Sequence, residues 1–354
     1  MEKLIQELIS LPGACGQEHA VIKYLYERLK DQTDTCYVNG LGDLIVTKKG
    51  AFDGPVLAVS AHTDEVGFIV KKIETSGLIR FEKLGGHDDR ILLSQKVIVH
   101  GENGPCPGVI GTISAHMQRF DNTSLIRNYR EMYIDIGAAD DAEVREMGVS
   151  EGDQITWDSP FTRCGKSRAY GHAFDDRCGC AVLLKAIENT DFSIVHGTLI
   201  GIFSTQEEVG LRGAAAAATS IRPDVALAVD TTAVSDTPEA MMDKTLALGK
   251  GAGIKVMDFS LLASKAVWKF MRKIAEENNI PCQLEIFTGI GTDAGALHQG
   301  NDGVPTGVIS IPSRYAHSSV EMIDMNDFEN CEKLLEAFLL NMRDSSQFAF
   351  LADC

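Results

Sequence analysis

The segment PVLAVSAHTDEVGF, residues 55–68, decides the fold of this chain. Its apolar first half is a continuous run, which is typical of a β-strand buried on both faces of a sheet. His62, Asp64 and Glu65 follow that run directly, where ordinary turn residues would be expected. In open α/β sheets, ligands collect at the carboxyl ends of the strands. The segment therefore predicts a buried strand that delivers polar side chains to a ligand site.

Three later segments contain apolar runs of the same kind. They are HGTLIGIFSTQEE at 196–208, PDVALAVDTT at 223–232 and TGVISIP at 306–312. Apolar residues also recur at helical spacing in five segments, at 4–9, 21–29, 179–189, 260–279 and 326–342. Buried strands that alternate with helices indicate an α/β sheet with helices on both of its faces.

Residues 67–164 follow a different pattern. Short strands are separated there by Gly, Pro, Asn and Asp, and only one modest helical segment occurs, near 140–147. Such a pattern is typical of a small, mostly β module. Because strand–helix alternation resumes at about residue 170, we expect this module to be inserted into a discontinuous α/β domain formed by 1–66 and 165–354.

Composition and charge narrow the possible partners and the cellular compartment. The 354 residues carry a formal net charge of −17, and an acidic surface repels nucleic acid. No apolar stretch is long enough to span a bilayer, and the N-terminus resembles an amphipathic helix rather than a signal peptide. Nine scattered cysteines suit a reducing compartment. We expect a cytoplasmic protein that binds neither nucleic acid nor membranes.

Histidines and carboxylates follow each buried strand, and an acidic pair precedes one helix. These residues are His62, Asp64, Glu207, Glu208, Asp230 and His317, with Asp175 and Asp176 before the helix. A single residue of this kind is usually structural. A lone histidine is often held by hydrogen bonds, and an aspartate at the end of a strand is usually a cap or turn residue. Together they suit a divalent metal, and imidazole with carboxylate favours zinc, cobalt or manganese.

Two metal ions would need five ligands with one carboxylate shared between them, an arrangement that recurs in hydrolases. A separate carboxylate must then take the proton from the attacking water, and the pair Glu207 and Glu208 is placed to divide these two tasks. The sequence contains no H-E-x-x-H, G-x-S-x-G or Walker motif. A single-zinc thermolysin-type site, a serine hydrolase and a nucleotide-binding protein are therefore disfavoured.

Six motifs in order resemble the tetrahedral di-metal aminopeptidase family, which includes bacterial glutamyl and deblocking aminopeptidases and members labelled cellulase or endoglucanase. They are AHTDEVGF, GHAFDDR, TQEEVGLRGA, AVDTT, GTDAGALH and SRYAHS. The resemblance implies a zinc-peptidase-like, three-layer α/β/α catalytic domain. It also implies that 67–164 is a β-barrel-like dimerisation domain, and that dimers assemble into a hollow dodecamer.

The resemblance also assigns a role to each matching residue. His62 and Asp230 would bind one metal, Glu208 and His317 would bind the other, Asp175 would bridge both, Glu207 would be the general base, and Asp64 would orient the imidazole of His62. His172, Thr63 and Ile290 replace a lysine, a methionine and a glycine that are common in the family. Ile290 would lie on a loop near the substrate side-chain pocket.

These observations predict a metal-dependent aminopeptidase that removes N-terminal residues from short peptides. Its cofactors would be two divalent ions, zinc before cobalt or manganese. The alternatives are another amide hydrolase such as a deacylase, a glycosidase of the kind named for some relatives, or a non-enzymatic, metal-dependent scaffold. The preferred N-terminal residue stays open, because periodicity does not place the loops that would line the pocket.

Overall fold

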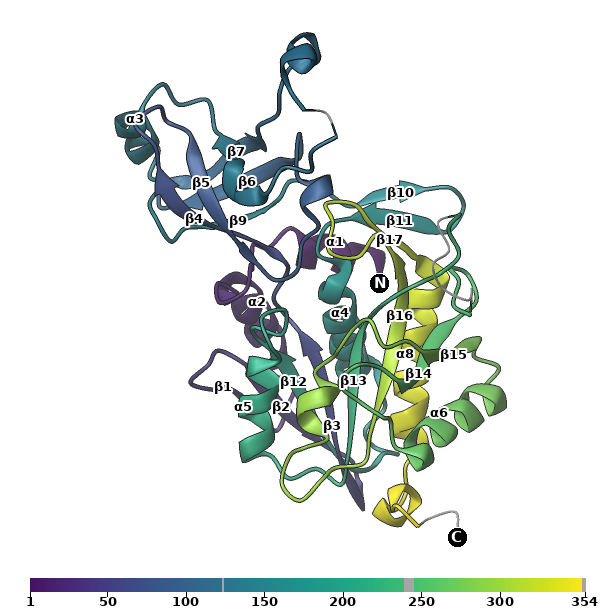
Figure 1. Ribbon diagram of the computed structural model, residues 1–354. Coiled ribbons are helices and arrows are strands. Elements are labelled where there is room, and N and C mark those ends of the chain that lie inside the picture. Colours follow the sequence, from purple (N-terminus) through teal and green to yellow (C-terminus); the bar gives the residue numbers. More distant parts are fainter. Residues whose placement is uncertain (123, 239–244, 352–354) are drawn as a thin grey trace.

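The computed structural model describes residues 1–122, 124–238 and 245–351. A large mixed sheet flanked by helices forms the lower body in Figure 1, and a closed barrel stands above one end of it. None of the helices in the described ranges is both long enough and apolar enough to cross a membrane.

The large sheet contains eleven strands, and four neighbouring strands at its centre run parallel. These four are, in spatial order, β12 (His196–Ser204), β3 (Phe52–His62), β13 (Val225–Ala233) and β16 (Thr306–Arg314). The others are β1 (Thr35–Val38), β2 (Leu44–Lys49), β10 (Thr162–Cys164), β11 (Arg168–Gly171), β14 (Ala252–Met257), β15 (Cys282–Ile286) and β17 (Glu321–Asp324). The parallel strands include all four apolar runs of the sequence, so their carboxyl ends lie along one edge.

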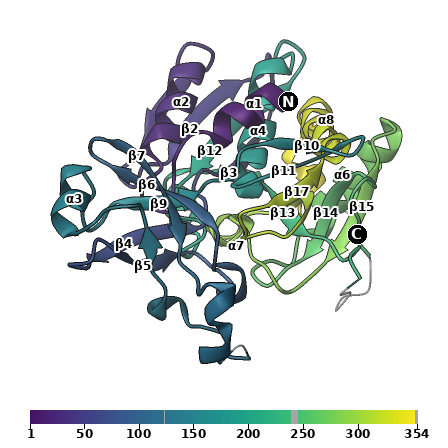
Figure 2. The ribbon, with the colours of Figure 1, turned by 90° about the horizontal axis from the view of Figure 1, so that it is seen from above.

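Successive residues of β3 show how the sheet is covered on both faces. Leu57 and Val59 belong to the main core with the helices of one face, whereas Ala58 packs in a second core with the helices of the other. The first face carries α1 (Glu2–Ile9), α2 (His19–Leu29), α4 (Phe174–Asn189), α6 (Lys265–Glu277) and α8 (Met325–Asn341) (Figure 2). The second carries α5 (Arg212–Ser220) and α7 (Ala294–Leu297). The predicted three-layer α/β/α architecture is confirmed, although the helix expected over 260–279 begins only at Lys265.

A six-stranded closed barrel follows β3, and it has a core of its own. Its strands are β4 (Gly67–Ile73), β5 (Ile79–Leu84), β6 (Lys96–Gly101), β7 (Gly104–Ile110), β8 (Ile134–Asp135) and β9 (Gln154–Trp157). The modest helix of the sequence analysis is α3 (Asp141–Glu146), which Asp140 caps. The expected division of the chain at 66/67 and 164/165 stays a prediction. The strand β10, which ends at residue 164, pairs in the large sheet.

Arg177 connects three segments at the base of the barrel. Its fully buried guanidinium donates to the carbonyls of Thr63, Leu8 and Leu11, and Nη2 lies 3.4 Å from Glu65 Oε1. Glu65 is buried as well, and its Oε2 lies 2.8 Å from Nδ1 of His172. Burial alone would raise the pKa of Glu65, but the charges of His172 and Arg177 hold that pKa below its usual value. Glu65, which the sequence left without a role, is thus the anion of a buried ionic cluster.

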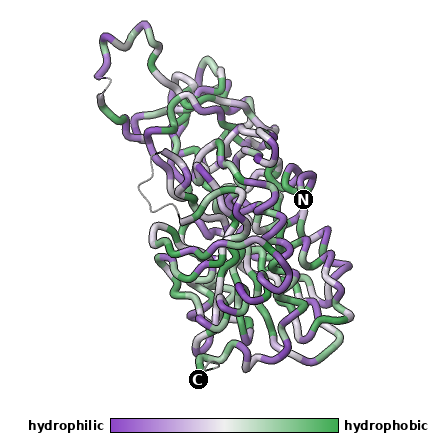
Figure 3. The backbone as a smooth tube through the Cα atoms, turned by 90° about the vertical axis from the view of Figure 1, so that its right-hand side faces the viewer, coloured by the Kyte–Doolittle hydropathy of each residue, from purple (hydrophilic) through white to green (hydrophobic). Residues whose placement is uncertain are grey.

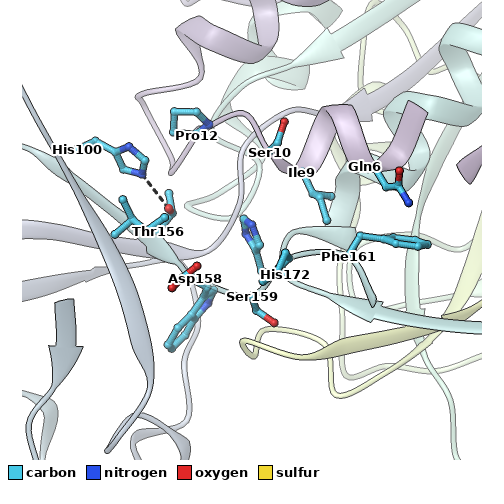
Figure 4. Close-up of a pocket in the computed structure, with 13 residues that line it drawn as sticks. Gln6, Ile9, Ser10, Pro12, His100, Thr156, Asp158, Ser159, Phe161 and His172 are labelled. Carbon is cyan, nitrogen blue, oxygen red and sulfur yellow. Dashed lines mark hydrogen bonds between the residues drawn. The ribbon is translucent and has the colours of Figure 1, made fainter. Parts of the chain in front are cut away.

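A cavity of about 390 Å³ lies beside this cluster, between α1, β6 and β9 (Figure 4). Two histidines line it, and both are engaged: His100 Nε2 lies 2.9 Å from Thr156 Oγ1, and His172 contacts Glu65. Among the described residues, no group of metal-ligating side chains includes either histidine. Both histidines therefore belong to the junction of barrel and sheet rather than to a metal site.

Replacing Glu65 by glutamine is expected to lower the free energy of unfolding by about 3 kcal/mol, because it removes the buried counter-charge of Arg177 at nearly constant volume. Urea titration with a tryptophan signal measures the change. Glu151→Gln is the matched control, since Glu151 pairs with Arg145 at the surface, and it should cost less than about 1 kcal/mol. Equal losses in the two variants would contradict the ionic cluster.

Candidate metal centre

The carboxyl edge of the parallel strands collects every residue that the sequence suggested as a metal ligand. His62 ends β3, Glu208 follows β12, Asp230 lies near the end of β13, His317 follows β16, and Asp175 lies at the start of α4. Their side chains approach from five different segments and line one cleft together with Glu207. The expectation that the strand ends meet in one place is thus realised in the fold.

Two overlapping sets of ligand atoms share Asp175. In the first set, His62 Nε2 lies 3.1 Å from Asp175 Oδ1 and 3.8 Å from Asp230 Oδ1. In the second set, His317 Nε2 lies 3.2 Å from Glu208 Oε1 and 3.6 Å from Asp175 Oδ2. Within each set the ligand atoms lie within 4.8 Å of one another. Asp175 therefore turns one carboxylate oxygen toward each set.

The hydrogen bonds of the two histidines leave the same ring nitrogen facing the carboxylates. His62 Nδ1 lies 3.2 Å from the carbonyl oxygen of Asp64, and His317 Nδ1 lies 3.0 Å from that of Gly86. Because a carbonyl oxygen only accepts, each Nδ1 carries a proton, and Nε2 is the ring atom that faces the carboxylates. Burial acts against a charged ring, but neighbouring carboxylates that include Asp175 raise the pKa of both histidines well above the usual value, so Nε2 also carries a proton in the absence of a metal. A metal ion would take the place of that proton and accept the Nε2 lone pair. The residues therefore fit a bound metal.

The acids at this edge also need positive charge. Burial raises the pKa of Asp230 well above its usual value, and the charge of Asp175 raises it further. Burial likewise raises the pKa of Glu207, where His62 acts in the opposite direction. The Oε1 atom of Glu208 is buried and accepts no hydrogen bond within the described structure. Divalent cations would offset this repulsion, which protonation offsets in their absence.

Asp64 contacts both the imidazole of His62 and the backbone of the loop after β12. Its Oδ1 lies 3.4 Å from His62 Nδ1, as expected of an orienting residue. The same carboxylate accepts the backbone N–H groups of Glu207 at 2.9 Å and Glu208 at 3.1 Å. Asp64 thereby joins the end of β3 to the loop after β12, and it fixes the backbone of two acids that face the cleft.

The sequence analysis missed Glu321, at the start of β17. Its side chain is buried, and it accepts the N–H of Asp175 on Oε2 and the N–H of His317 on Oε1, both at 2.9 Å. Burial and the charge of Asp175 raise the pKa of Glu321 to about 8. A glutamate four residues after a ligand histidine was the available signal, but spacing alone does not reveal bonds to two distant backbones.

Three further residues have structural partners rather than ligand positions. Asp176 accepts the N–H of Gly179, as suits an acid in the first turn of a helix. Asp293 accepts the hydroxyls of Ser60 and Ser204. Arg314 donates from Nε and Nη2 to both oxygens of Asp236, at 2.6 and 2.7 Å.

Residues 42–334 match the family described as M42 glutamyl aminopeptidase. The chain belongs to this family. A putative aminopeptidase from Acetivibrio thermocellus is 38% identical to this M42 protein over 335 residues, which cover 95% of this chain and 97% of that relative.

Two solved structures resemble the M42 protein over nearly its whole length. An aminopeptidase from the archaeon Desulfurococcus kamchatkensis superposes with a TM-score of 0.91 at 36% identity, and the match covers 96% of this chain and 94% of that one. A TET1 peptidase from Pyrococcus horikoshii, described as able to assemble into a tetrahedron or a large octahedral shell, superposes with a TM-score of 0.87 at 32% identity. That match covers 96% of this chain and 99% of the other.

These similarities confirm the family, the fold class and the enzyme class that the sequence predicted. The M42 protein is a metal-dependent aminopeptidase. Two of the three alternatives, the deacylase and the non-enzymatic scaffold, are not favoured by any of these relatives.

Removing divalent ions with a chelator is expected to lower the melting temperature, because ions that bind only the folded protein stabilise it, by about 4 kcal/mol at a thousand times the dissociation constant. Thermal scans before and after re-addition of zinc measure the effect. His100→Ala, in the junction cavity, should keep the full zinc-dependent shift, whereas His317→Ala should lose most of it. A melting temperature that is indifferent to zinc would contradict the fit of the site to a metal.

Proposed function

We propose that the M42 protein removes N-terminal residues from short peptides with two divalent ions, held in turn by His62 with Asp230 and by Glu208 with His317. The observation that carries this proposal is Asp175, whose two oxygens face the two histidines. Imidazole with carboxylate suits zinc first, and also cobalt or manganese. Such ions supply Lewis acidity toward a carbonyl and toward water.

Glu207 is the general base in this proposal. Its Oε2 lies 4.0 Å from His62 Nε2, and the side chain lines the cleft beside the proposed ligands. Glu207 forms a third group with His62 and Glu208 but is absent from the two groups that share Asp175, which leaves it free to act as the base. Its carboxylate takes a proton from the attacking water and returns it to the nitrogen of the leaving amine. Burial raises the pKa of Glu207 above that of an ordinary glutamate, so its ionised carboxylate is a stronger base than a solvated one.

Asp64 is a positioning residue in this proposal. It holds the imidazole of His62 through Nδ1 and holds the backbone of Glu207 and Glu208 through their N–H groups. Partners of this kind, which touch no substrate, aim the ligands and tune their basicity.

Glu207→Gln is expected to bind zinc as the wild type does and to lower kcat on an aminoacyl anilide by at least about a hundredfold, because the amide cannot accept the proton. Isothermal titration with zinc and steady-state kinetics measure the two properties. Glu208→Gln is the comparison, and it should weaken zinc binding and activity together. A Glu207→Gln protein with wild-type kcat would remove the general-base assignment.

We also propose that the barrel mediates self-association into dimers and larger shells. The segment between β7 and β8 extends away from the barrel at the top of Figure 1, and Figure 3 shows hydrophobic stretches along it. Its exposed apolar side chains are Ile113, Met117, Phe120, Leu125 and Ile126. Such a concentration of apolar surface is typical of a protein–protein contact.

Phe120→Asp is expected to shift the protein to smaller species in analytical ultracentrifugation, because a buried unpaired carboxylate opposes association. Phe120 is 70% exposed in the single chain. Phe350→Asp is the matched control, since Phe350 is 99% exposed near the other end of the molecule and should leave the distribution unchanged. Equal distributions for wild type and Phe120→Asp would place the contact elsewhere.

The cytoplasmic location and the lack of nucleic-acid partners stay predictions. The cysteines within the described residues are free, which suits a reducing compartment. The net charge of −17 opposes binding to a phosphate backbone.

A further inference from the structure

Two chemically different groups of residues line the cleft beside the metal centre. The cleft has a volume of about 1170 Å³, and one group consists of the histidines and carboxylates described above. The other group is apolar and comes from three loops, with Leu211, Phe259, Phe287 and Ile290 among its residues, and we call the last three the apolar wall. Phe259 is 82% exposed, an unusual position for a phenylalanine with no ligand against it.

Backbone hydrogen bonds hold two of these loops side by side. The N–H of Phe259 donates to the carbonyl of Ile290 at 2.9 Å, and the N–H of Phe287 donates to that of Met257 at 3.1 Å. Asp258 fixes the turn after Phe259 by accepting the backbone N–H of Leu261 at 2.7 Å. The apolar side chains are therefore displayed from an ordered backbone.

A buried ionic group lies beneath the same two loops. Lys255 Nζ is 3.3 Å from Asp258 Oδ2 and 3.1 Å from Glu285 Oε1, and all three side chains are fully buried. Thr232 donates its hydroxyl to Glu285 at 2.7 Å, which connects the group to the strand that carries Asp230. The ionic group thus links the loops of the apolar wall to the strand β13, which also carries the proposed metal ligand Asp230.

No lysine or arginine lines the cleft within the part of the chain that the structure describes. Three cations from neighbouring segments have carboxylate partners. Lys255 is buried with Asp258 and Glu285, Arg314 binds both oxygens of Asp236, and Arg90 binds Asp88. Arg212, which follows Leu211, donates to the amide oxygen of Gln206 and does not line the cleft. Within the described part of the cleft, an acidic substrate side chain would therefore find no counter-charge and would meet the carboxylates of the metal centre.

Among its described residues, the cleft also lacks an available carboxylate that could pair with a basic substrate side chain. The carboxylates that line the cleft are the proposed metal ligands, the proposed base Glu207, and Asp88. Asp88 is engaged by Arg90, whose Nε lies 2.9 Å from Oδ1 and 2.8 Å from Oδ2. A lysine side chain on the substrate would therefore lose its hydration without gaining an ion pair.

We infer that the enzyme selects a neutral, apolar N-terminal residue of the size of leucine, methionine or phenylalanine, although its family is described by a glutamyl activity. This inference rests on the proposed function, because it takes the cleft to hold the residue that is removed. The apolar wall of Phe259, Phe287 and Ile290 buries that side chain. Ile290 contributes a branched apolar side chain to that wall.

A panel of aminoacyl p-nitroanilides tests the inference, because all members share one leaving group. With the zinc-loaded enzyme, kcat/KM for the leucyl, methionyl and phenylalanyl substrates should exceed that for the glutamyl and lysyl substrates by at least about a hundredfold. A glutamyl or lysyl substrate that equals the leucyl one would overturn the inference and leave the aminopeptidase activity standing. A lack of hydrolysis across the panel with zinc, cobalt and manganese would instead remove the proposed function.

Lysine substitutions in the apolar wall provide a second test of the inference. Phe259→Lys should raise the ratio of glutamyl to leucyl kcat/KM by about tenfold, because it supplies the missing counter-charge. Leu262→Lys is the matched control: Leu262 is 76% exposed in the same segment and does not line the cleft, so the ratio should stay at the wild-type value. Ile290→Lys and Ile286→Lys form a second pair on the other loop, where Ile286 is 64% exposed outside the cleft. Equal ratios within both pairs would overturn the inference.

Discussion

Mutual repulsion among carboxylates buried at one edge of the sheet is the constraint on which this structure depends. Three of the four parallel strands deliver acids to the same edge, and few of those acids reach bulk water. Folding can bring them together only where protons or metal ions neutralise part of their charge. Asp64 and Glu321 support this edge by accepting the backbone N–H groups of residues that face the cleft.

The placement of the strands and the meeting of polar side chains at their carboxyl ends could be predicted from the sequence because both depend on local pattern. A continuous apolar run marks a strand buried on both faces, and a parallel sheet brings the ends of such strands together, so His62, Asp230 and His317 could be predicted to meet. The backbone partners of the ligands could not be predicted. Glu321 and Gly86 act through bonds between segments far apart in sequence, and any residue can supply a carbonyl.

The loops of the apolar wall show a second limit of sequence patterns. Strands β14 and β15 support them, yet neither strand was singled out from the sequence, and α6 begins later than its periodicity suggested. The buried lysine of this region is surprising in isolation, because charged side chains avoid the interior unless they are paired. Its two carboxylate partners lie on different elements, so only the tertiary structure explains its position.

The hydrogen bond from His317 to the carbonyl of Gly86 reaches from the catalytic sheet to a loop that follows barrel strand β5. A Cβ atom at position 86 would lie 3.3 Å from Nδ1 of that imidazole, so any larger residue there would press on the ring. The barrel therefore cannot be exchanged for that of a relative without regard to this contact. A transplanted barrel would keep the proton on Nδ1 of His317 only if its loop after β5 placed a carbonyl at the same position, even where the strands matched well.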